Sequence, residues 1–282
     1  MGNSEWNSLL AYQLLNDTNT SSIEDALIVS MDRKLNTLSH LKYPLDLEFI
    51  ASIFGIDPNF RYVEMQQAGR LVPLEGKWYI EVNKHHQRVR QRFSIAHEIG
   101  HKAVMTSKHR IPKERMAYNP THEKDEEEEM CDLFASFLLG LRPQHIISIL
   151  DDRGFSLTTI DYLTSQLNVS FETATRALVR HAEIPVAILY CLPTLIANTE
   201  RFYVQRYYPA AQFPLTFKGK SILPPFNCLT RAWLGNKAAK MLELWQIGRQ
   251  DTYTCLLEAK RMPIYASETR EDGLVVAVII QE

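Results

Sequence analysis

Two histidines and a glutamate lie close together in the run His97-Glu98-Ile99-Gly100-His101. On an α-helix, residues four apart share one face, so the two imidazoles could converge on a single Zn²⁺ ion. Glu98 lies one step round the helix, off that face, and could take a proton from a metal-bound water. This spacing is the H-E-x-x-H motif, and the chemistry it predicts is metal-assisted hydrolysis of a peptide bond.

The residues around the motif favour a helix. Ser94 could cap its first turn, and Ile95, Ile99 and Ala103 provide an apolar flank. Gly100 is the only poor helix former, and it costs up to about 1 kcal/mol relative to alanine. We interpret this glycine as a position that lets a second backbone approach the metal side. A motif this short also arises by chance, but the helical context makes that the weaker alternative.

A catalytic zinc takes three protein ligands plus a water, so a further ligand should come from a second element. The run from Glu126 to Leu139 predicts a helix with bulky apolar residues at the spacing of a core-facing stripe. These residues are Met130, Leu133, Phe134, Phe137 and Leu138. An adjacent stripe consists of small and acidic residues, Glu128, Cys131, Asp132 and Ala135. Small residues would allow this stripe to approach the first helix closely.

Glu128 would then point at the metal, and Asp132, one turn later, could accept the free ring N–H of a ligand histidine. The alternative is that the acidic run is a solvated helix N-terminus, stabilised by the helix dipole. We interpret Glu126, Glu127 and Glu129 in that way. Helix geometry prefers Glu128 as the third ligand over its neighbours without excluding them.

These residues also resemble a known family. The run Arg92–His101, followed by Glu128, Cys131-Asp132 and Phe134-Ala135, resembles the ImmA/IrrE family of metallopeptidases. The resemblance implies that His97, His101 and Glu128 are the metal ligands and that Glu98 is the catalytic acid and base. It also implies Zn²⁺ as the cofactor, with Mn²⁺ or another divalent metal as alternatives.

The chain has 282 residues, 45% of them hydrophobic, which allows two or three domains. We predict an α+β protein. Residues 1–143 would form a zincin-like metallopeptidase domain of helices with a small sheet, and residues 144–183 a helix-turn-helix-like segment. Residues 184–282 would form a separate α+β domain, which the resemblance to IrrE-like proteins suggests is GAF-like.

The middle segment predicts two helices, Thr159–Leu167 and Phe171–His181, on either side of Asn168-Val169-Ser170. Asparagine tolerates the left-handed conformation that the turn needs, and the serine can cap the second helix. The second helix could lie in a DNA groove with Arg176 and Arg180 on phosphates. The two helices could instead simply pack between domains, and we favour this alternative because the basic surface is thin.

After Pro185 the sequence pattern changes and mostly predicts β-strands. The predicted strands are Val186–Tyr190, Arg201–Tyr207, Thr252–Ala259 and Leu274–Ile280, and the predicted helix is Ala232–Trp245. Several aromatic residues in this part could line a pocket for a small molecule or form ordinary core. They are Phe202, Tyr207, Phe213, Phe217 and Trp233.

Composition and charge indicate where the protein is located and which partners it is expected to lack. The four cysteines are widely scattered and form no C-x-x-C pair, which indicates reduced thiols in a cytoplasmic protein. A net charge of −2 argues against broad attraction to nucleic acid. No run approaches the roughly eighteen apolar residues of a membrane span, and no signal peptide is evident, so we expect no membrane partner.

The sequence therefore predicts a zinc endopeptidase that activates water through Glu98. The resemblance implies that its substrate is a helix-turn-helix repressor of the XRE type, cleaved to derepress stress or mobile-element genes. His122 or Tyr118 could stabilise the oxyanion. The alternatives are a DNA-binding or ligand-sensing regulator with a non-catalytic zinc, or a toxin–antitoxin component.

Overall fold

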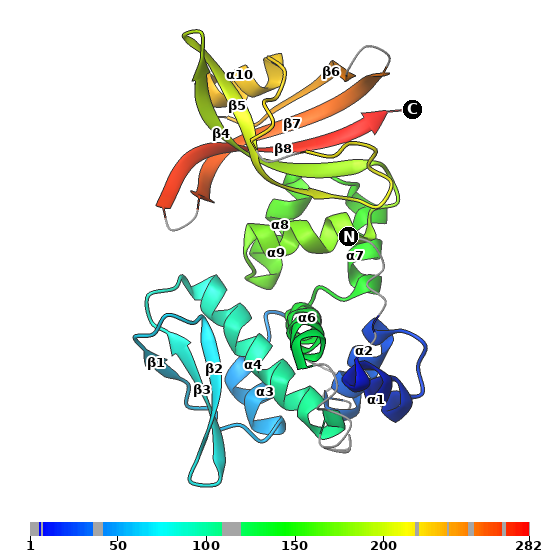
Figure 1. The fold of residues 1–282 in the computed structure, drawn as a ribbon, viewed down its shortest axis with the longest axis vertical. Helices are drawn as coiled ribbons and strands as arrows, with labels where there is room; N and C mark the ends of the chain where they lie inside the picture. The colour runs from blue at the N-terminus through cyan, green and yellow to red at the C-terminus, as the bar shows by residue number, and fades with distance from the viewer. Residues whose placement is uncertain are drawn as a thin grey trace. The chain divides into compact units, whose positions relative to one another are not determined.

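The computed structural model describes residues 6, 8–35, 42–108, 120–217, 220–235, 237–247, 251–266 and 269–281. The chain forms two compact units. One comprises Asn3–Arg142 together with Leu163–Thr173, and the other comprises Pro143–Tyr162 together with Ala174–Glu282. Both contain helices and a β-sheet, so the fold is of the α+β class, as predicted (Figure 1).

The first unit combines helices with a three-stranded sheet. Its helices are α1 (Leu9–Thr18), α2 (Ile23–Leu35), α3 (Leu47–Ile53), α4 (Arg88–Lys108) and α6 (Pro120–Leu138). Its strands are β1 (Arg61–Val63), β2 (Gly69–Leu74) and β3 (Lys77–Asn83). The strand order is β1-β3-β2, with β1 parallel and β2 antiparallel to β3, so β2 forms one edge of the sheet.

A tight turn sets the register of the β2–β3 hairpin. Its two central residues, Glu75 and Gly76, both have positive φ, at 50° and 78°. Two-residue hairpin turns with positive φ at both positions match the right-handed twist of the strands that they join. The turn pairs Leu74 with Lys77, and the pairing then continues to Gly69 opposite Val82.

Helix α6 forms much of the core of this unit. The predicted apolar stripe is buried as expected, and Phe134 packs edge-on against Phe54, the residue that follows α3, at 5.8 Å between ring centroids. The buried residues of the stripe are Met130, Leu133, Phe134, Phe137 and Leu138. Helix α6 contacts α1, α2 and α4, and Cys131, on the face next to this stripe, lies beside Gly100 of α4.

Helix α4 begins earlier than predicted. It starts at Arg88, six residues before Ser94, so the prediction that Ser94 caps the helix is wrong. The Ser94 hydroxyl instead donates to the carbonyl of Arg90 at 3.0 Å, the bond that an interior serine makes to the preceding turn. Arg92, one turn before Ala96, donates to the carbonyl of Leu45 at 3.1 Å and ties α4 to the segment before α3.

The second unit is built around a five-stranded antiparallel sheet. Its strands, β4 (Val186–Ile196), β5 (Thr199–Pro209), β6 (Ala239–Ile247), β7 (Asp251–Ala266) and β8 (Thr269–Gln281), have the order β5-β4-β8-β7-β6. Helix α7 (Pro143–Arg153) also belongs to this unit, and α10 (Asn227–Gly235) packs against β6, β7 and β8 (Figure 1). The sheet is therefore covered by α10 on the side of its aromatic core.

The predicted helix over Ala232–Trp245 is wrong. Helix α10 ends at Gly235, and β6 begins at Ala239. Along β6, Leu242 and Leu244 are exposed, whereas Trp245 is buried, so the side chains alternate between two faces as in a strand. Over so short an apolar run, periods of two and of 3.6 residues are hard to tell apart.

Helices α8 (Leu157–Leu167) and α9 (Phe171–His181) confirm the two helices predicted on either side of Asn168-Val169-Ser170. Asn168 has a left-handed φ of 52°, and the Ser170 hydroxyl accepts the backbone N–H of Thr173 at 3.0 Å. Arg176, proposed for phosphate binding, has its guanidinium 5.2 Å from the ring centroid of Tyr208 on β5. Each of the two helices contributes residues to both compact units.

The aromatic side chains of the second unit form its core. Phe202 packs against Trp233 at 5.4 Å between centroids, and Tyr207 packs against Phe217 at 5.0 Å. Phe213 is buried in the same cluster. This packing favours the core interpretation of these residues over the pocket interpretation. The GAF-like assignment of residues 184–282 stays a prediction.

No single helix within the described ranges is long and apolar enough to cross a membrane, although α6 and α7 pass that test as a bent pair.

Candidate metal centre

The site is built at a close approach between α4 and α6. A Cβ atom added to Gly100 would lie 3.2 Å from both the Cα and the carbonyl oxygen of Cys131. These distances are tighter than ordinary van der Waals contact, so a glycine is needed for this spacing. Both sequence interpretations are confirmed here, since another backbone approaches Gly100 and it carries a small residue.

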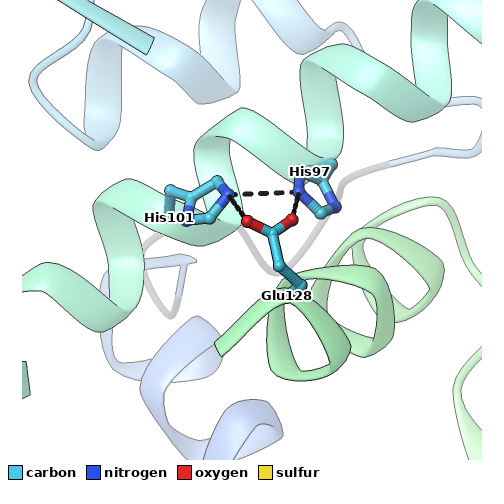
Figure 2. Close-up of side chains that lie close together, drawn as sticks. All are labelled: His97, His101 and Glu128. Atoms are coloured by element: carbon cyan, nitrogen blue, oxygen red, sulfur yellow. Dashed lines mark hydrogen bonds and ion pairs between the residues drawn. The ribbon is translucent and has the colours of Figure 1, made fainter. Parts of the chain in front are cut away.

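Three predicted site residues come together across this contact. Figure 2 shows the rings of His97 and His101 projecting from α4 toward the carboxylate of Glu128 on α6. The two Nε2 atoms are 3.1 Å apart, and the Glu128 oxygens lie 3.2 Å from that of His97 and 3.7 Å from that of His101. One ligand atom from each residue lies within 4.8 Å of the other two, which is close enough to share one ion.

The outer nitrogen of each ring has a carboxylate partner. Nδ1 of His97 lies 2.8 Å from Asp132, the partner anticipated from the sequence. Nδ1 of His101 lies 3.2 Å from Glu127. A carboxylate accepts the proton of Nδ1, which leaves the lone pair on Nε2 and directs it toward the shared point.

The interpretation of Glu126 and Glu127 as solvated residues is therefore wrong. The side chain of Glu127 is only 15% exposed, and Glu126 accepts the backbone N–H of Ser8 at 3.0 Å. Glu129 is exposed, as expected. Glu127 lies one helical turn before Cys131, the residue that touches Gly100. Residues one turn apart share a helix face, so this spacing could have indicated from the sequence that Glu127 faces α4.

Burial and charge set the proton affinity of the site. Burial alone would lower the pKa of His97, but the hydrogen bond and charge of Asp132, with the charges of Glu98 and Glu128, raise the pKa above its ordinary value. Burial raises the pKa of Glu98, which is 7% exposed, although the charges of both histidines act in the opposite direction. The backbone N–H of Leu71 on β2 also donates to the Glu98 carboxylate.

Residues 59–178 match the family described as the IrrE N-terminal-like domain, Peptidase_M78. Over that segment the chain is similar to the IrrE N-terminal-like family, as the sequence resemblance predicted. The match supports a metallopeptidase of the IrrE/ImmA kind, and the segment includes α4, α6, α8 and α9 as far as residue 178.

A solved structure shares the fold of the whole chain. A Mycobacterium tuberculosis transcriptional regulator is similar with a TM-score of 0.54 and 14% sequence identity. The match covers 96% of this chain and 80% of that one. No curated protein sequence matches.

The other polar residues considered from the sequence are not members of the His97, His101 and Glu128 group. His85 lies 3.8 Å from Glu64, and its neighbour His86 has a pKa lowered by burial and by nearby Arg90. Tyr118 and the side chain of His122, proposed for the oxyanion, lie outside the described residues.

Proposed function

We propose that this chain is a metal-dependent endopeptidase in which His97, His101 and Glu128 bind one divalent ion. The observation that carries the proposal is the convergence of three acceptors. With both Nδ1 atoms donating to carboxylates, two Nε2 lone pairs and a carboxylate point at one another. A cation between the members of this group would stabilise all three acceptors at once.

The donor set fits zinc. Zinc accepts imidazole nitrogen and carboxylate oxygen, and two histidines with one glutamate are the ligands of several zinc peptidases. Two nitrogens at about 2.0–2.1 Å in tetrahedral geometry are about 3.3 Å apart. The two Nε2 atoms are separated by 3.1 Å, which is close to that value. Asp132 and Glu127 would orient the two rings.

A divalent metal at this site would supply Lewis acidity, which lowers the pKa of a water molecule and polarises a peptide carbonyl. Glu98 lies next to the ligands with its carboxylate buried beside β2. In the proposed reaction Glu98 accepts the proton of the attacking water and later gives it to the leaving amine. The hydroxide forms the new bond to the carbonyl carbon, and the C–N bond breaks.

The proposed substrate is a helix-turn-helix repressor of the XRE type, with stress or mobile-element genes as the regulated targets. This part rests on the resemblance to ImmA/IrrE proteins. The structural neighbour is a transcriptional regulator, and a role of this chain in transcription control would be consistent with that similarity. The β-rich second unit would act as a sensor, with a small molecule as its ligand.

The test is cleavage of candidate XRE-type repressors, resolved on gels, by the unsubstituted chain and by Glu98→Gln. Glutamine keeps the shape of the side chain and removes the base, so we expect a loss of about 10²–10⁴-fold in rate with metal content unchanged. Glu129→Gln is the matched control, because Glu129 is an exposed carboxylate on α6. Cleavage by Glu98→Gln at the unsubstituted rate would overturn the proposal.

The two helices α8 and α9, joined by a short turn, support a second candidate, a DNA-binding regulator with a non-catalytic zinc. The position of Arg176 against Tyr208 weighs against a phosphate contact by this arginine. The two candidates differ in the response of cells to Glu98→Gln. A regulator would keep its biological response, whereas a peptidase would lose it.

A further inference from the structure

The edge strand β2 lies against Glu98 with no room for a side chain between them. A Cβ atom added to Gly69 would lie 3.2 Å from Oε1 of Glu98 and 3.3 Å from Cβ of Ser94. Any larger residue at position 69 would therefore displace the carboxylate or the strand by a few tenths of an ångström. The glycine allows the backbone of β2 to reach the carboxylate directly.

The ladder between β2 and β3 shows which backbone groups of β2 point away from the sheet. Asn83 donates its backbone N–H to the carbonyl of Ala68, and the antiparallel register continues with Arg70 and Val72. Alternate residues of an antiparallel strand turn their backbone groups outward. At the edge of the sheet, Leu71 therefore has an outward N–H, and Glu98 accepts it.

Pro73 supports this assignment independently. It occupies the next outward position of β2, where the missing N–H removes no bond to β3. The outward edge of β2 thus has one N–H between Gly69 and Pro73, that of Leu71, and it is directed at the carboxylate. The side chain of Val72 lies on the other face of the strand, opposite Tyr79.

We propose that Gly69 and the Leu71 N–H of β2 are positioning groups that hold the Glu98 carboxylate in the orientation needed for proton transfer. This inference rests on the proposed function. A glutamate has three rotatable bonds, and a base that is free to rotate would spend little time within reach of the water proton. A donor on a rigid strand, brought close by a glycine, selects one orientation.

Leu71→Pro removes the N–H, and Pro73 shows that β2 accommodates proline at an outward position. Leu71→Ala removes the side chain but keeps the N–H, so the ratio of the two variants isolates the hydrogen bond. The assay uses an XRE-type repressor that the unsubstituted chain cleaves. We expect kcat of Leu71→Pro to be about 10–100-fold below that of Leu71→Ala, with KM within about twofold.

Gly69→Ala should give a similar loss in kcat, because its new methyl group displaces the carboxylate. Val72→Ala, on the other face of β2, is the control and should retain the unsubstituted kcat. Zinc affinity, measured by competition with a chromophoric chelator, should stay within about threefold in all four variants. Equal kcat values for Leu71→Pro and Leu71→Ala would overturn the inference, as would a loss of zinc affinity that matches the loss of kcat.

Amide hydrogen exchange in the unsubstituted chain and in Glu98→Ala tests the contact without any substrate. Glu98→Ala should speed exchange at the Leu71 amide and leave the Val72 amide, which faces β3, protected. Unchanged exchange at Leu71 would overturn the positioning role even in an active peptidase. If exchange at Leu71 speeds up as expected but no repressor is cleaved, the proposed peptidase function is wrong. The contact between Leu71 and Glu98 would then be real but would have no catalytic role.

Discussion

Replacing Gly100 by alanine adds one methyl group at the close approach between α4 and α6. Two opposing effects follow. Alanine in a helix interior is more favourable than glycine by about 0.8–1.0 kcal/mol. The new Cβ, however, would lie 3.2 Å from the Cα and carbonyl oxygen of Cys131 and 3.4 Å from its Cβ. Two of these three atoms are backbone, so a rotation of the Cys131 side chain cannot relieve the contact.

Overpacking of a buried contact costs about 1–3 kcal/mol. Combined with the gain in helix propensity, the expected net loss of unfolding free energy is about 0–2 kcal/mol. The effect on metal binding should be larger. Separation of the helices by a few tenths of an ångström moves Glu128 relative to His97 and His101, whereas metal–ligand distances tolerate only about 0.2 Å. We expect zinc affinity to fall by about 10–100-fold.

Urea denaturation of the metal-free protein and chelator competition for zinc measure the two effects separately. Gly235→Ala in α10 is the matched control, because nothing lies within 4 Å of the Cβ position there. It should leave zinc affinity unchanged. If Gly100→Ala stabilises the protein by about 1 kcal/mol and binds zinc as tightly as before, the two helices are not in the close contact described, and the reasoning fails.

Three other predictions follow from contacts outside the ligand set. Glu127→Gln should weaken zinc binding by about 10–100-fold in the chelator assay, because the ring of His101 loses its charged partner, whereas Glu129→Gln should not. Burial raises the pKa values of Cys228 and Cys255 to about 11, so at pH 8 about one thiol in a thousand is ionised, and Ellman's reagent should react with them only after denaturation. Glu258→Ala removes the buried acceptor of the first backbone N–H of α8, and urea denaturation should show a loss of about 1–3 kcal/mol.

The convergence of the two histidines of the candidate metal centre could be predicted from the sequence because it depends on local geometry. A spacing of four residues places His97 and His101 on one face of any helix, whatever that helix packs against. The stripe of small residues on α6 likewise identified the face that meets α4. The role of Glu127 was missed because it depends on how two helices cross. A rotation of α6 by a fraction of a turn would exchange the environments of Glu127 and its neighbours.

The contact between the edge of β2 and Glu98 could not have been predicted from the sequence. Gly69 resembles any loop glycine, and its importance arises from contact with Glu98, almost thirty residues later in the chain. The start of α4 was misplaced for a related reason. Ser94 is a good capping residue in isolation, but its hydroxyl is used inside the helix, and tertiary contacts of the first turns, such as that of Arg92 with Leu45, extend the helix backward.

The number of converging ligands bears on whether a metal here would be structural or catalytic. Structural zinc sites are closed by four protein ligands, whereas catalytic sites have three and leave one position open. Within the described parts of the chain, one group of potential ligands is close enough to share an ion, and it has three members, His97, His101 and Glu128. Glu98 is engaged by the backbone of β2 instead of joining them. Three such ligands, with the buried Glu98 carboxylate alongside, would leave a position for water and provide a base to deprotonate it, which favours the proposed hydrolysis over a structural zinc.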